Sequence, residues 1–318
     1  MEKRVLFLDT AHPSLAEELE KMGFECTHYH GNDRQAILSV IGDFDGIVIR
    51  SKIKLDRRVL EKAHRLKFIG RVGAGMENID VPYAESRGIR CLNAPEGNRD
   101  AVGEHAIGML LALNNHLCRV NRQVRNGIWI REANRGTEIQ GKTIGIIGYG
   151  NMGSAFAEKL IGFGVRIIAY DKYLSGFGNQ FVHEVQMDAI FRETDVLSLH
   201  VPLTAETHHL VDKTYLQSFE KPIILVNTAR GQCVKTADLL DAIDTGSVAG
   251  AALDVLEYES LSFENLNAED LPPGFKRLIE CEKVLLSPHI AGWTHESNRK
   301  LAIALVQKIA ALYGMQFQ

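Results

Sequence analysis

The sequence predicts an α/β protein with parallel sheets, divided into about two domains. Short apolar runs alternate with helix-like segments over residues 1–95 and again beyond residue 143, which is the pattern of a parallel sheet covered by helices. A glycine-rich turn joins the apolar run Ile144–Ile147 directly to a helix-like segment. The length of 318 residues and the hydrophobic content of 45% allow two sizeable cores.

Composition excludes several classes of protein. The net charge of −4 gives no reason to expect a nucleic-acid partner. The N-terminus has too short an apolar core for a signal peptide, and no run approaches ~18 apolar residues, so we expect a cytoplasmic chain without a membrane partner. The five cysteines are dispersed without a CxxC pair, which indicates reduced thiols. No metal site is expected, because the histidine pairs His28/His30 and His208/His209 lack partner ligands at metal spacing.

The first 95 residues contain the elements of one sheet. The pattern predicts strands at Val5–Leu8, Gly46–Ile49, Phe68–Val72 and Ile89–Leu92, and helices at Pro13–Met22 and Arg57–His64. Arg50 and Arg71 stand at the carboxyl ends of two of these strands, where ligands bind in open α/β sheets. Position alone leaves two interpretations open: an anion site, or two solvated surface arginines.

The middle of the chain connects the two series of strands. Residues 93–98 have turn chemistry and suggest a crossing between domains. A largely apolar helix is predicted over Ala101–Val120, too polar at its ends to span a membrane. The polar segment Asn121–Thr137, which contains Trp129, is either an arm that reaches a neighbouring subunit or a solvated loop.

The stretch from Thr143 to Asp171 carries the most specific local pattern. A strand leads into Gly148-Tyr149-Gly150-Asn151-Met152-Gly153, a helix follows, and a second strand (Arg166–Tyr170) ends at Asp171. The glycines permit a tight turn, a close approach to a pyrophosphate and close packing of the helix on the strand. Asp171 stands where a carboxylate accepts hydrogen bonds from a ribose diol. A 2′-phosphate there would meet like charge, so the pattern predicts NAD rather than NADP.

Three strand ends in the second half carry side chains capable of acid–base chemistry. Strands are predicted at Asp195–Leu199, Ile223–Asn227, Ala249–Leu253 and Val284–Leu286, with helices at Thr214–Phe219, Thr236–Asp244 and Glu296–Leu312 and a long acidic loop over 257–275. Arg230, a cluster of acids from Asp254 to Glu259, and His289 follow three of these strands. A histidine suits proton transfer and an arginine suits a substrate carboxylate. Taken singly, Arg230 could be an ordinary ion-pair partner and His289 a buried structural histidine.

Together these segments resemble the D-isomer-specific 2-hydroxyacid dehydrogenases. The resemblance covers nearly the whole chain and is carried by GRVGAGMENID, NAPEGNRDAVGEHAIGMLLAL, GYGNMG, VNTARG, AALDVLEYE and SPHIAG. It implies two doubly wound parallel-sheet domains, with a Rossmann NAD-binding domain (98–287) inserted into a flavodoxin-like substrate domain built from both chain ends (1–97 and 288–318). It also implies a homodimer formed through the 101–120 helix and the following arm.

The resemblance assigns roles to individual residues. Arg230 would clamp the substrate carboxylate and carbonyl, His289 would be the acid/base, and Glu259 would support it. Glu257 is the rival for that supporting role, but Glu259 lies 29 residues after Arg230, a spacing that resembles the family's. The cofactor contacts implied by the motifs are Gly148, Tyr149, Gly150, Asn151, Met152, Gly153, Asp171, Val201, Pro202, Thr207, Thr228, Ala229, Asp254 and Ala291. The substrate contacts implied are Arg50, Arg71, Val72, Gly73 and Ala74.

Within the family, the motifs around Arg50 and Arg71 resemble most those of the phosphoglycerate dehydrogenases, which makes 3-phosphoglycerate the leading substrate. The alternatives are reduction of glyoxylate or hydroxypyruvate, and an NAD(H)-sensing binding protein of the corepressor type. Trp293 stands where a small residue is common. Whether Trp293, or Arg131 on the arm, contacts substrate stays open.

Overall fold

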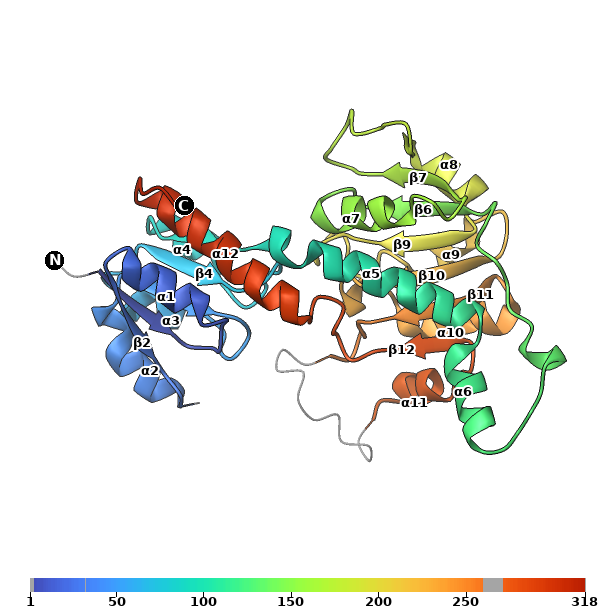
Figure 1. Cartoon of the computed structure of the whole chain (residues 1–318), viewed down its shortest axis with the longest axis horizontal. Helices are drawn as coiled ribbons and strands as arrows, with labels where there is room; N and C mark the ends of the chain where they lie inside the picture. The colour runs from blue at the N-terminus through green and yellow to red at the C-terminus, as the bar shows by residue number, and fades with distance from the viewer. Residues whose placement is uncertain (1–2, 32, 260–270, 318) are drawn as a thin grey trace. The chain divides into compact units, whose positions relative to one another are not determined.

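A computed structural model describes residues 3–31, 33–259 and 271–317 of the chain (Figure 1). The chain divides into two compact units, Met1–Asn98 with Trp293–Gln318, and Arg99–Gly292. Each unit contains one sheet in which all paired strands are parallel. The predicted fold class, two doubly wound parallel-sheet domains, is therefore confirmed.

The sheet of the first unit has five strands in the order β2-β1-β3-β4-β5. This is the flavodoxin-like order of a doubly wound fold. Its strands are β1 (Lys3–Phe7), β2 (Phe24–His28), β3 (Gly46–Ile49), β4 (Phe68–Arg71) and β5 (Arg90–Leu92). Because β3 and β4 are neighbours with Ile49 opposite Arg71, the segments that follow them leave the same edge of the sheet.

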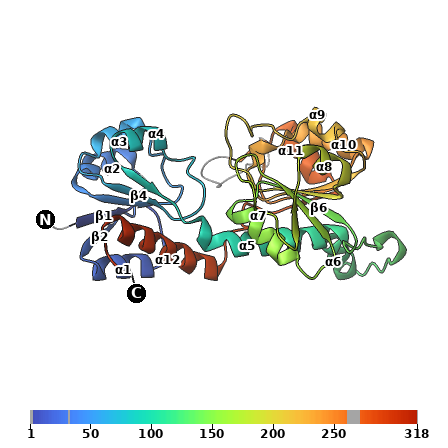
Figure 2. The same cartoon turned by 90° about the horizontal axis from the view of Figure 1, so that it is seen from above.

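Helices cover both faces of this sheet (Figure 2). One face carries α1 (Ser14–Lys21) and the long C-terminal helix α12 (His295–Leu312), whose Leu301, Leu305 and Ile309 are buried against it. The other face carries α2 (Arg34–Val40), α3 (Arg57–Lys62) and α4 (Val81–Ser86). The C-terminal helix thus returns to complete the core of the N-terminal segment.

The sheet of the second unit has seven strands in the order β12-β11-β10-β9-β6-β7-β8. Counted from β6, this is the Rossmann strand order with one further strand, and the order reverses between β6 and β9. Its strands are β6 (Thr143–Ile147), β7 (Arg166–Tyr170), β8 (Val182–Glu184), β9 (Val196–Leu199), β10 (Ile223–Asn227), β11 (Val248–Leu253) and β12 (Val284–Leu286). Ligands bind at such a reversal, beyond the carboxyl ends of the strands.

Alternate strand residues face two separate cores in this unit, because successive side chains in a strand point to opposite faces. Ile144 and Ile146 pack with α5 (Pro95–Asn114) and α7 (Asn151–Leu160). Ile147 belongs to the core on the opposite face. That face is covered by α8 (Met187–Glu193), α9 (Lys213–Gln217), α10 (Thr236–Thr245) and α11 (Pro273–Glu280).

Several predicted elements differ from the structure. The turn expected over 93–98 is in part helical, because α5 begins at Pro95, and proline is well suited to the first turn of a helix. The single helix expected over Ala101–Val120 is two helices, α5 and α6 (Leu117–Arg125), separated where His116 adopts a left-handed conformation with φ of 53°. Of the loop expected over 257–275, residues 260–270 lie outside the described residues.

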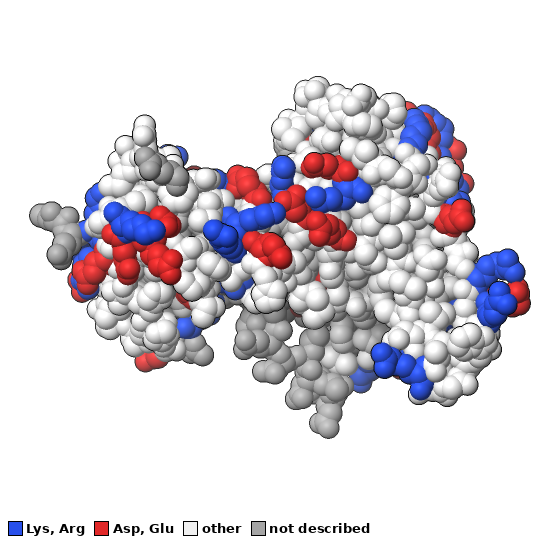
Figure 3. Space-filling view, viewed as in Figure 1, with Lys and Arg blue, Asp and Glu red and all other residues white. Residues whose placement is uncertain are grey.

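The surface drawn in Figure 3 carries both signs of charge. Lys and Arg side chains lie among Asp and Glu on that face and do not form a continuous patch of one sign. Among the described residues, no helix has the length and apolar character required to cross a membrane.

Candidate active site

The glycine-rich turn after β6 leaves open space at one of its three glycines. Gly148 has a φ of +88°, and a Cβ on it would lie 2.7 Å from the carbonyl oxygen of His200. A Cβ on Gly153 would lie 2.0 Å from the carbonyl oxygen of Gly148. The packing of the protein itself therefore requires these two glycines. By contrast, a Cβ on Gly150 would meet no heavy atom within 4 Å, so this glycine faces open space beside the turn.

Helix α7 begins immediately after that open position, at Asn151. The first N–H groups of a helix have no partner within it, and with the helix dipole they favour a negative group. Open space at Gly150 and the amino end of α7 together fit a pyrophosphate, and the sequence-predicted residues Asn151, Met152 and Gly153 supply these N–H groups.

Asp171 lies at the end of β7 and already has a structural role. One of its oxygens accepts a hydrogen bond from the backbone N–H of Tyr149 (2.7 Å), and the other accepts from the N–H groups of Tyr173 and Leu174 (both 2.9 Å). A carboxylate offers about four acceptor positions, so one more hydrogen bond is available to a ribose hydroxyl. The sequence pattern predicts only the ribose contact and gives no sign that Asp171 also anchors the turn.

The loops after β9 and β10 hold the other predicted cofactor residues. Thr207 donates its hydroxyl hydrogen to the carbonyl of Pro202 (2.6 Å), which closes the loop that follows Val201. After β10, the buried amide of Asn227 accepts from the N–H of Ala229 (3.0 Å). These bonds fix the loop conformations from within the chain.

The hydroxyl of Thr228 has no hydrogen-bond partner among the described residues, although its oxygen is buried. A buried hydroxyl normally has a partner, because an unmade hydrogen bond is costly. This oxygen stands at the carboxyl end of β10, where the motif implies contact with the nicotinamide end of the cofactor. It is a second feature of this unit that fits a bound dinucleotide.

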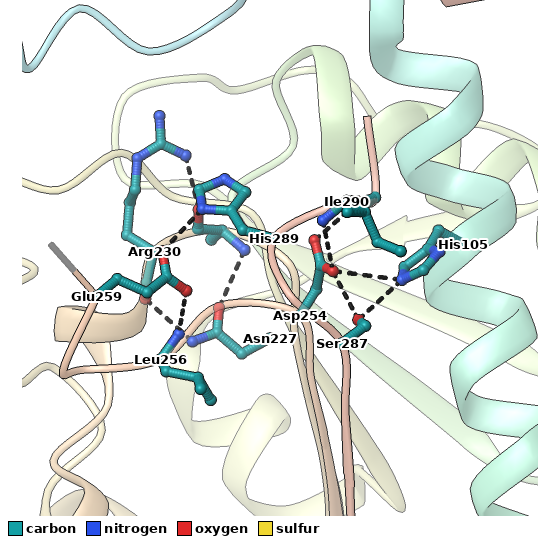
Figure 4. Close-up of polar contacts among 11 residues, drawn as sticks. His105, Asn227, Arg230, Asp254, Leu256, Glu259, Ser287, His289 and Ile290 are labelled. Atoms are coloured by element: carbon teal, nitrogen blue, oxygen red, sulfur yellow. Dashed lines mark hydrogen bonds and ion pairs between the residues drawn. The ribbon is translucent and has the colours of Figure 1, made fainter. Parts of the chain in front are cut away.

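His289 and Glu259 form a hydrogen-bonded pair (Figure 4). Nδ1 of His289 lies 2.8 Å from Oε2 of Glu259, and both side chains are largely shielded from solvent. The other oxygen of Glu259 accepts from the N–H of Leu256 at 2.5 Å. The carboxylate is therefore held on one side by backbone and orients the imidazole on the other.

Glu257, the rival for this supporting role, has other partners. Its oxygens contact Nε2 of His209 (2.7 Å) and the N–H of Thr236 (2.8 Å), which lies at the start of α10. Burial raises the pKa of the Glu257 carboxyl, but the hydrogen bonds from Thr236 and His209 outweigh burial and lower it. In the structure, Glu259 and not Glu257 is the partner of His289.

Arg230, Glu259 and His289 follow β10, β11 and β12, which are successive neighbours in the sheet. Since the carboxyl ends of parallel neighbours meet at one edge, the three residues leave the same edge, and Figure 4 draws them together. Arg230 donates from Nη1 to the carbonyl of Ala229 (2.6 Å). The structure thus assembles, within one unit, the cation, the acid and the histidine that the sequence predicted.

Asp254 anchors the loop that carries His289. Its side chain is completely buried. It accepts hydrogen bonds from the hydroxyl of Ser287 (2.6 Å) and from the N–H groups of Ile290 (2.9 Å) and Ala291 (2.8 Å). His289 itself has a left-handed backbone with φ of 55°, a conformation that costs energy for a non-glycine residue. The bonds to Asp254 on both sides stabilise that conformation.

A histidine from α5 completes this anchor. Nε2 of His105 lies 3.0 Å from the Ser287 hydroxyl and 3.4 Å from Asp254 (Figure 4). Burial raises the pKa of the Asp254 carboxyl, but its hydrogen bonds with His105, Ser287 and the backbone outweigh burial and hold the pKa at about 2. The sequence motifs place Asp254 only at the cofactor and give no sign of His105 and Ser287 as its partners, because no local pattern links positions so far apart.

The first unit holds the predicted substrate residues. Arg71 reaches back over Gly73, where a Cβ would overlap its Nη1 at 1.3 Å. The φ of +152° at Gly73 and the bond from the side chain of Asn93 to the carbonyl of Ala74 (2.6 Å) fix the loop from Val72 to Ala74. Arg50, at the same edge, stacks on the ring of Trp293.

Comparison with known families decides the class of the protein. Residues 107–291 match the model of the D-isomer specific 2-hydroxyacid dehydrogenase NAD binding domain. The chain belongs to the D-isomer-specific 2-hydroxyacid dehydrogenase family. It is therefore an NAD-dependent oxidoreductase of D-2-hydroxy acids, and the predictions of family and of NAD are confirmed.

Relatives in this family cover most of the chain. It is 35% identical to a hydroxypyruvate reductase of Thermotoga maritima over 93% of this chain and 94% of that protein. It is 34% identical to a D-3-phosphoglycerate dehydrogenase of Archaeoglobus fulgidus over 96% of this chain, but spans only 56% of that protein's length. A crystal structure of D-lactate dehydrogenase from Aquifex aeolicus complexed with NAD and lactic acid matches 98% of this chain with a TM-score of 0.84 and 28% identity. The three relatives are named for three different substrates: hydroxypyruvate, D-3-phosphoglycerate and D-lactate.

Proposed function

We propose that the protein oxidises 3-phosphoglycerate, a D-2-hydroxy acid with a distal phosphate, or reduces the corresponding 2-oxo acid. The observation that carries this proposal is the placement of Arg50 and Arg71 at one edge of the first sheet: Arg50 directly follows β3, and Arg71 is the last residue of the neighbouring β4. Two guanidinium groups at one edge suit a dianion, because each offers a planar fork of N–H donors. The likeness to D-3-phosphoglycerate dehydrogenases supports the same substrate.

In this proposal the pair of His289 and Glu259 handles the proton. When bound, NAD supplies the acceptor for the hydride. With Nδ1 of His289 held by Glu259 at 2.8 Å, Nε2 is the atom that takes the proton of the substrate hydroxyl during oxidation and returns it during reduction. The carboxylate of Glu259 stabilises the imidazolium that forms and keeps the ring in one orientation.

The substrate's carboxylate and reacting oxygen have two proposed binding groups. Arg230 would bind the carboxylate in bidentate fashion and polarise the neighbouring oxygen, a role that its fixed charge suits. The glycine-containing loop from Val72 to Ala74 would offer backbone N–H groups to the same carboxylate, as an anion nest. The φ of Gly73 gives this loop the irregular backbone that such nests use.

A second candidate substrate is hydroxypyruvate. The observation that favours it is the 35% identity to a hydroxypyruvate reductase over nearly the whole of both chains. The chemistry at His289 would be the same, and only the group that faces Arg50 and Arg71 would differ.

A panel of substrates tests these proposals. NADH formation from D-3-phosphoglycerate is compared with NADH consumption on hydroxypyruvate and glyoxylate, at matched enzyme concentrations. We expect the highest kcat/KM with 3-phosphoglycerate. A clear preference for hydroxypyruvate or glyoxylate would replace the proposed substrate, and NADH binding without turnover of any of these acids would support a nucleotide-sensing binding protein.

We further propose that the protein is a homodimer. The segment from α6 onward exposes Leu117, Val124, Ile128, Trp129 and Ile130. A cluster of exposed apolar side chains usually marks an interaction site, and a second copy of the same arm is the occupant that the resemblance implies. Light scattering coupled to size exclusion should give twice the chain mass, and Trp129→Asp with Ile130→Asp should shift it toward the monomer. A wild-type monomer would contradict the proposal.

We also propose a cytoplasmic location. The cysteines Cys26, Cys91, Cys118, Cys233 and Cys281 are all free thiols, as expected in a reducing compartment. Fractionation of cells that produce the protein from its native locus should recover it with cytoplasmic markers.

A further inference from the structure

Arg50 is held rigidly at its backbone. One oxygen of Asp9 accepts hydrogen bonds from three successive N–H groups, those of Arg50 (2.7 Å), Ser51 (3.0 Å) and Lys52 (3.0 Å). The side-chain amide of Asn78 donates to the carbonyl of Arg50 (3.0 Å). The main chain at the end of β3 is thereby fixed on both sides, and the position from which the Arg50 side chain starts is well defined.

The side chain of Arg50 is held by an aromatic ring. Its Cζ lies 3.9 Å from the centre of the Trp293 ring, within the same unit. Arg50 is half-buried, and its guanidinium donates no hydrogen bond to any described residue. Trp293 is 66% exposed, so its indole packs on the guanidinium at the surface and is not part of the core.

Trp293 in turn is fixed by the start of α12. The next residue, Thr294, caps this helix: its hydroxyl accepts from the N–H of Ser297 and its N–H donates to the hydroxyl of Ser297 (both 3.0 Å). The helix is itself anchored in the core by Leu301 and Leu305. Both members of the Arg50–Trp293 pair therefore stand on rigid backbone.

An arginine whose Cζ lies over an aromatic ring has the ring on one side only, and its N–H groups remain available on the others. Stacking on an aromatic face leaves the planar fork of donors available for a carboxylate or phosphate, and it removes part of the rotamer freedom that an arginine loses on binding. An arginine prepared in this way binds an anion more tightly than one that samples many conformations. The indole gives no such help to a substrate whose distal group is uncharged.

We propose that Trp293 is a specificity-determining residue, which positions Arg50 and so sets a preference for substrates whose distal group is an anion. The inference rests on the proposed function in one respect, that the loop after β3 faces the substrate. Trp293 follows His289 by four residues, so the same stretch of chain carries the proposed acid/base and the residue that orders the anion site.

Kinetics on two acids that differ only in the distal group test this proposal. D-3-phosphoglycerate carries a phosphate where D-glycerate carries a hydroxyl. For Trp293→Ala we expect KM for 3-phosphoglycerate to rise about 3- to 30-fold, the range for a lost cation–π contact, with kcat and the kinetics on D-glycerate within about twofold of wild type. Trp293→Phe should restore part of the loss, because a smaller aromatic face still stacks.

A matched control removes another guanidinium–aromatic pair of the same unit. Cζ of Arg57 lies 5.0 Å from the ring centre of Tyr83. Tyr83→Leu should leave KM and kcat for both acids unchanged. In an Arg50→Met background, Trp293→Ala should have no further effect if it acts through Arg50. An equal loss on both acids, or no loss on 3-phosphoglycerate, would overturn the proposal.

A second measurement does not depend on turnover. The chain contains two tryptophans, so Trp129→Phe leaves Trp293 as the single indole reporter. Titration with 3-phosphoglycerate should change the Trp293 fluorescence in a saturable way, and titration with D-glycerate should not. Arg50→Met should abolish the response to 3-phosphoglycerate. A saturable response in a protein that oxidises no hydroxy acid would refute the proposed function and keep this inference. Turnover of 3-phosphoglycerate without a response would refute the inference alone.

Discussion

Replacement of Asp254 by Asn tests the anchor beneath His289. The carboxylate is completely buried and accepts from Ser287, Ile290 and Ala291 at 2.6 to 2.9 Å. An amide keeps the shape but places an NH₂ group where one oxygen stood. At least one donor then faces another donor, and the bonds that survive lose the help of the charge.

The cost follows from these bonds. An unsatisfied buried donor costs about 1–3 kcal/mol, and each surviving bond weakens by about 1 kcal/mol when its acceptor becomes neutral. We therefore expect Asp254→Asn to lower the free energy of unfolding by about 3–5 kcal/mol. Since a misplacement of about 1 Å at a catalytic group can cost about 10² in rate, we also expect kcat to fall about 100-fold.

Urea unfolding followed by circular dichroism, together with kcat and the Kd for NADH, measures both effects. Asp195→Asn is the matched control, because Asp195 also holds a backbone N–H, that of Thr143 (2.7 Å), but belongs to no proposed site. It should lower stability and leave kcat unchanged. Ser287→Ala should also lower kcat, since the Ser287 hydroxyl donates to Asp254 (2.6 Å) and helps to hold the loop that carries His289. Wild-type kcat and an unchanged unfolding midpoint in Asp254→Asn would refute the anchoring role.

The acid side of the stability curve gives an independent check. The pKa of Asp254 is lowered in the folded state to about 2, so its contribution is present above the unfolded pKa of 3.8 and is lost as pH falls toward 2. The loss amounts to roughly 2 kcal/mol over that window. Asp254→Asn should show a shallower fall in stability there than wild type. A parallel fall in the two proteins would mean that these bonds do not lower the pKa of Asp254.

Three further predictions concern the cofactor domain. Gly150→Ala should leave the free energy of unfolding unchanged, since its Cβ meets nothing within 4 Å, but it should weaken NADH binding in a fluorescence titration. Gly153→Ala should lower the free energy of unfolding as well, because its Cβ would lie 2.0 Å from backbone. Equal NADH affinity in Gly150→Ala and wild type would mean that the pyrophosphate does not bind beside Gly150. Asp171→Asn should lower the preference for NAD over NADP in kcat/KM, and an unchanged ratio would mean that another group reads the ribose. Burial lowers the pKa of His200 from 6.5 to about 3, so this group should lower the free energy of unfolding by about 1.4 kcal/mol per pH unit as pH falls below 6.5. His200→Phe should therefore reduce the acid slope in urea unfolding, and an undiminished slope would contradict this prediction.

Local patterns were sufficient to predict the strand, turn and helix that we expect to bind the cofactor phosphates. The strand, turn and helix around Gly148 were predictable because each residue answers a local requirement, such as the φ of +88° at Gly148. The edge strand β2 was missed because Glu25 and Thr27 interrupt its apolar pattern. The break between α5 and α6 was not predicted, because it occurs at His116 in a left-handed conformation and no glycine or proline in the sequence marks it.

In the site, the residues proposed to transfer the proton could be predicted from the sequence, and the residues that hold them in place could not. Glu259 and His289 could be named from their motifs and lie 2.8 Å apart. The anchor from His105 through Ser287 to Asp254 joins positions from three separate segments, so only the folded chain brings them together. Similarly, the stacking of Arg50 on Trp293 depends on a C-terminal helix that returns to the first sheet.

The most direct measurement is the turnover of His289→Asn beside its affinity for NADH. General acid–base assistance contributes about 10²–10⁴ in rate, so kcat for a D-2-hydroxy acid should fall by that factor while the Kd for NADH stays within about twofold of wild type. Near-normal turnover in His289→Asn would contradict the assignment of His289 as the acid/base of a hydride-transfer enzyme.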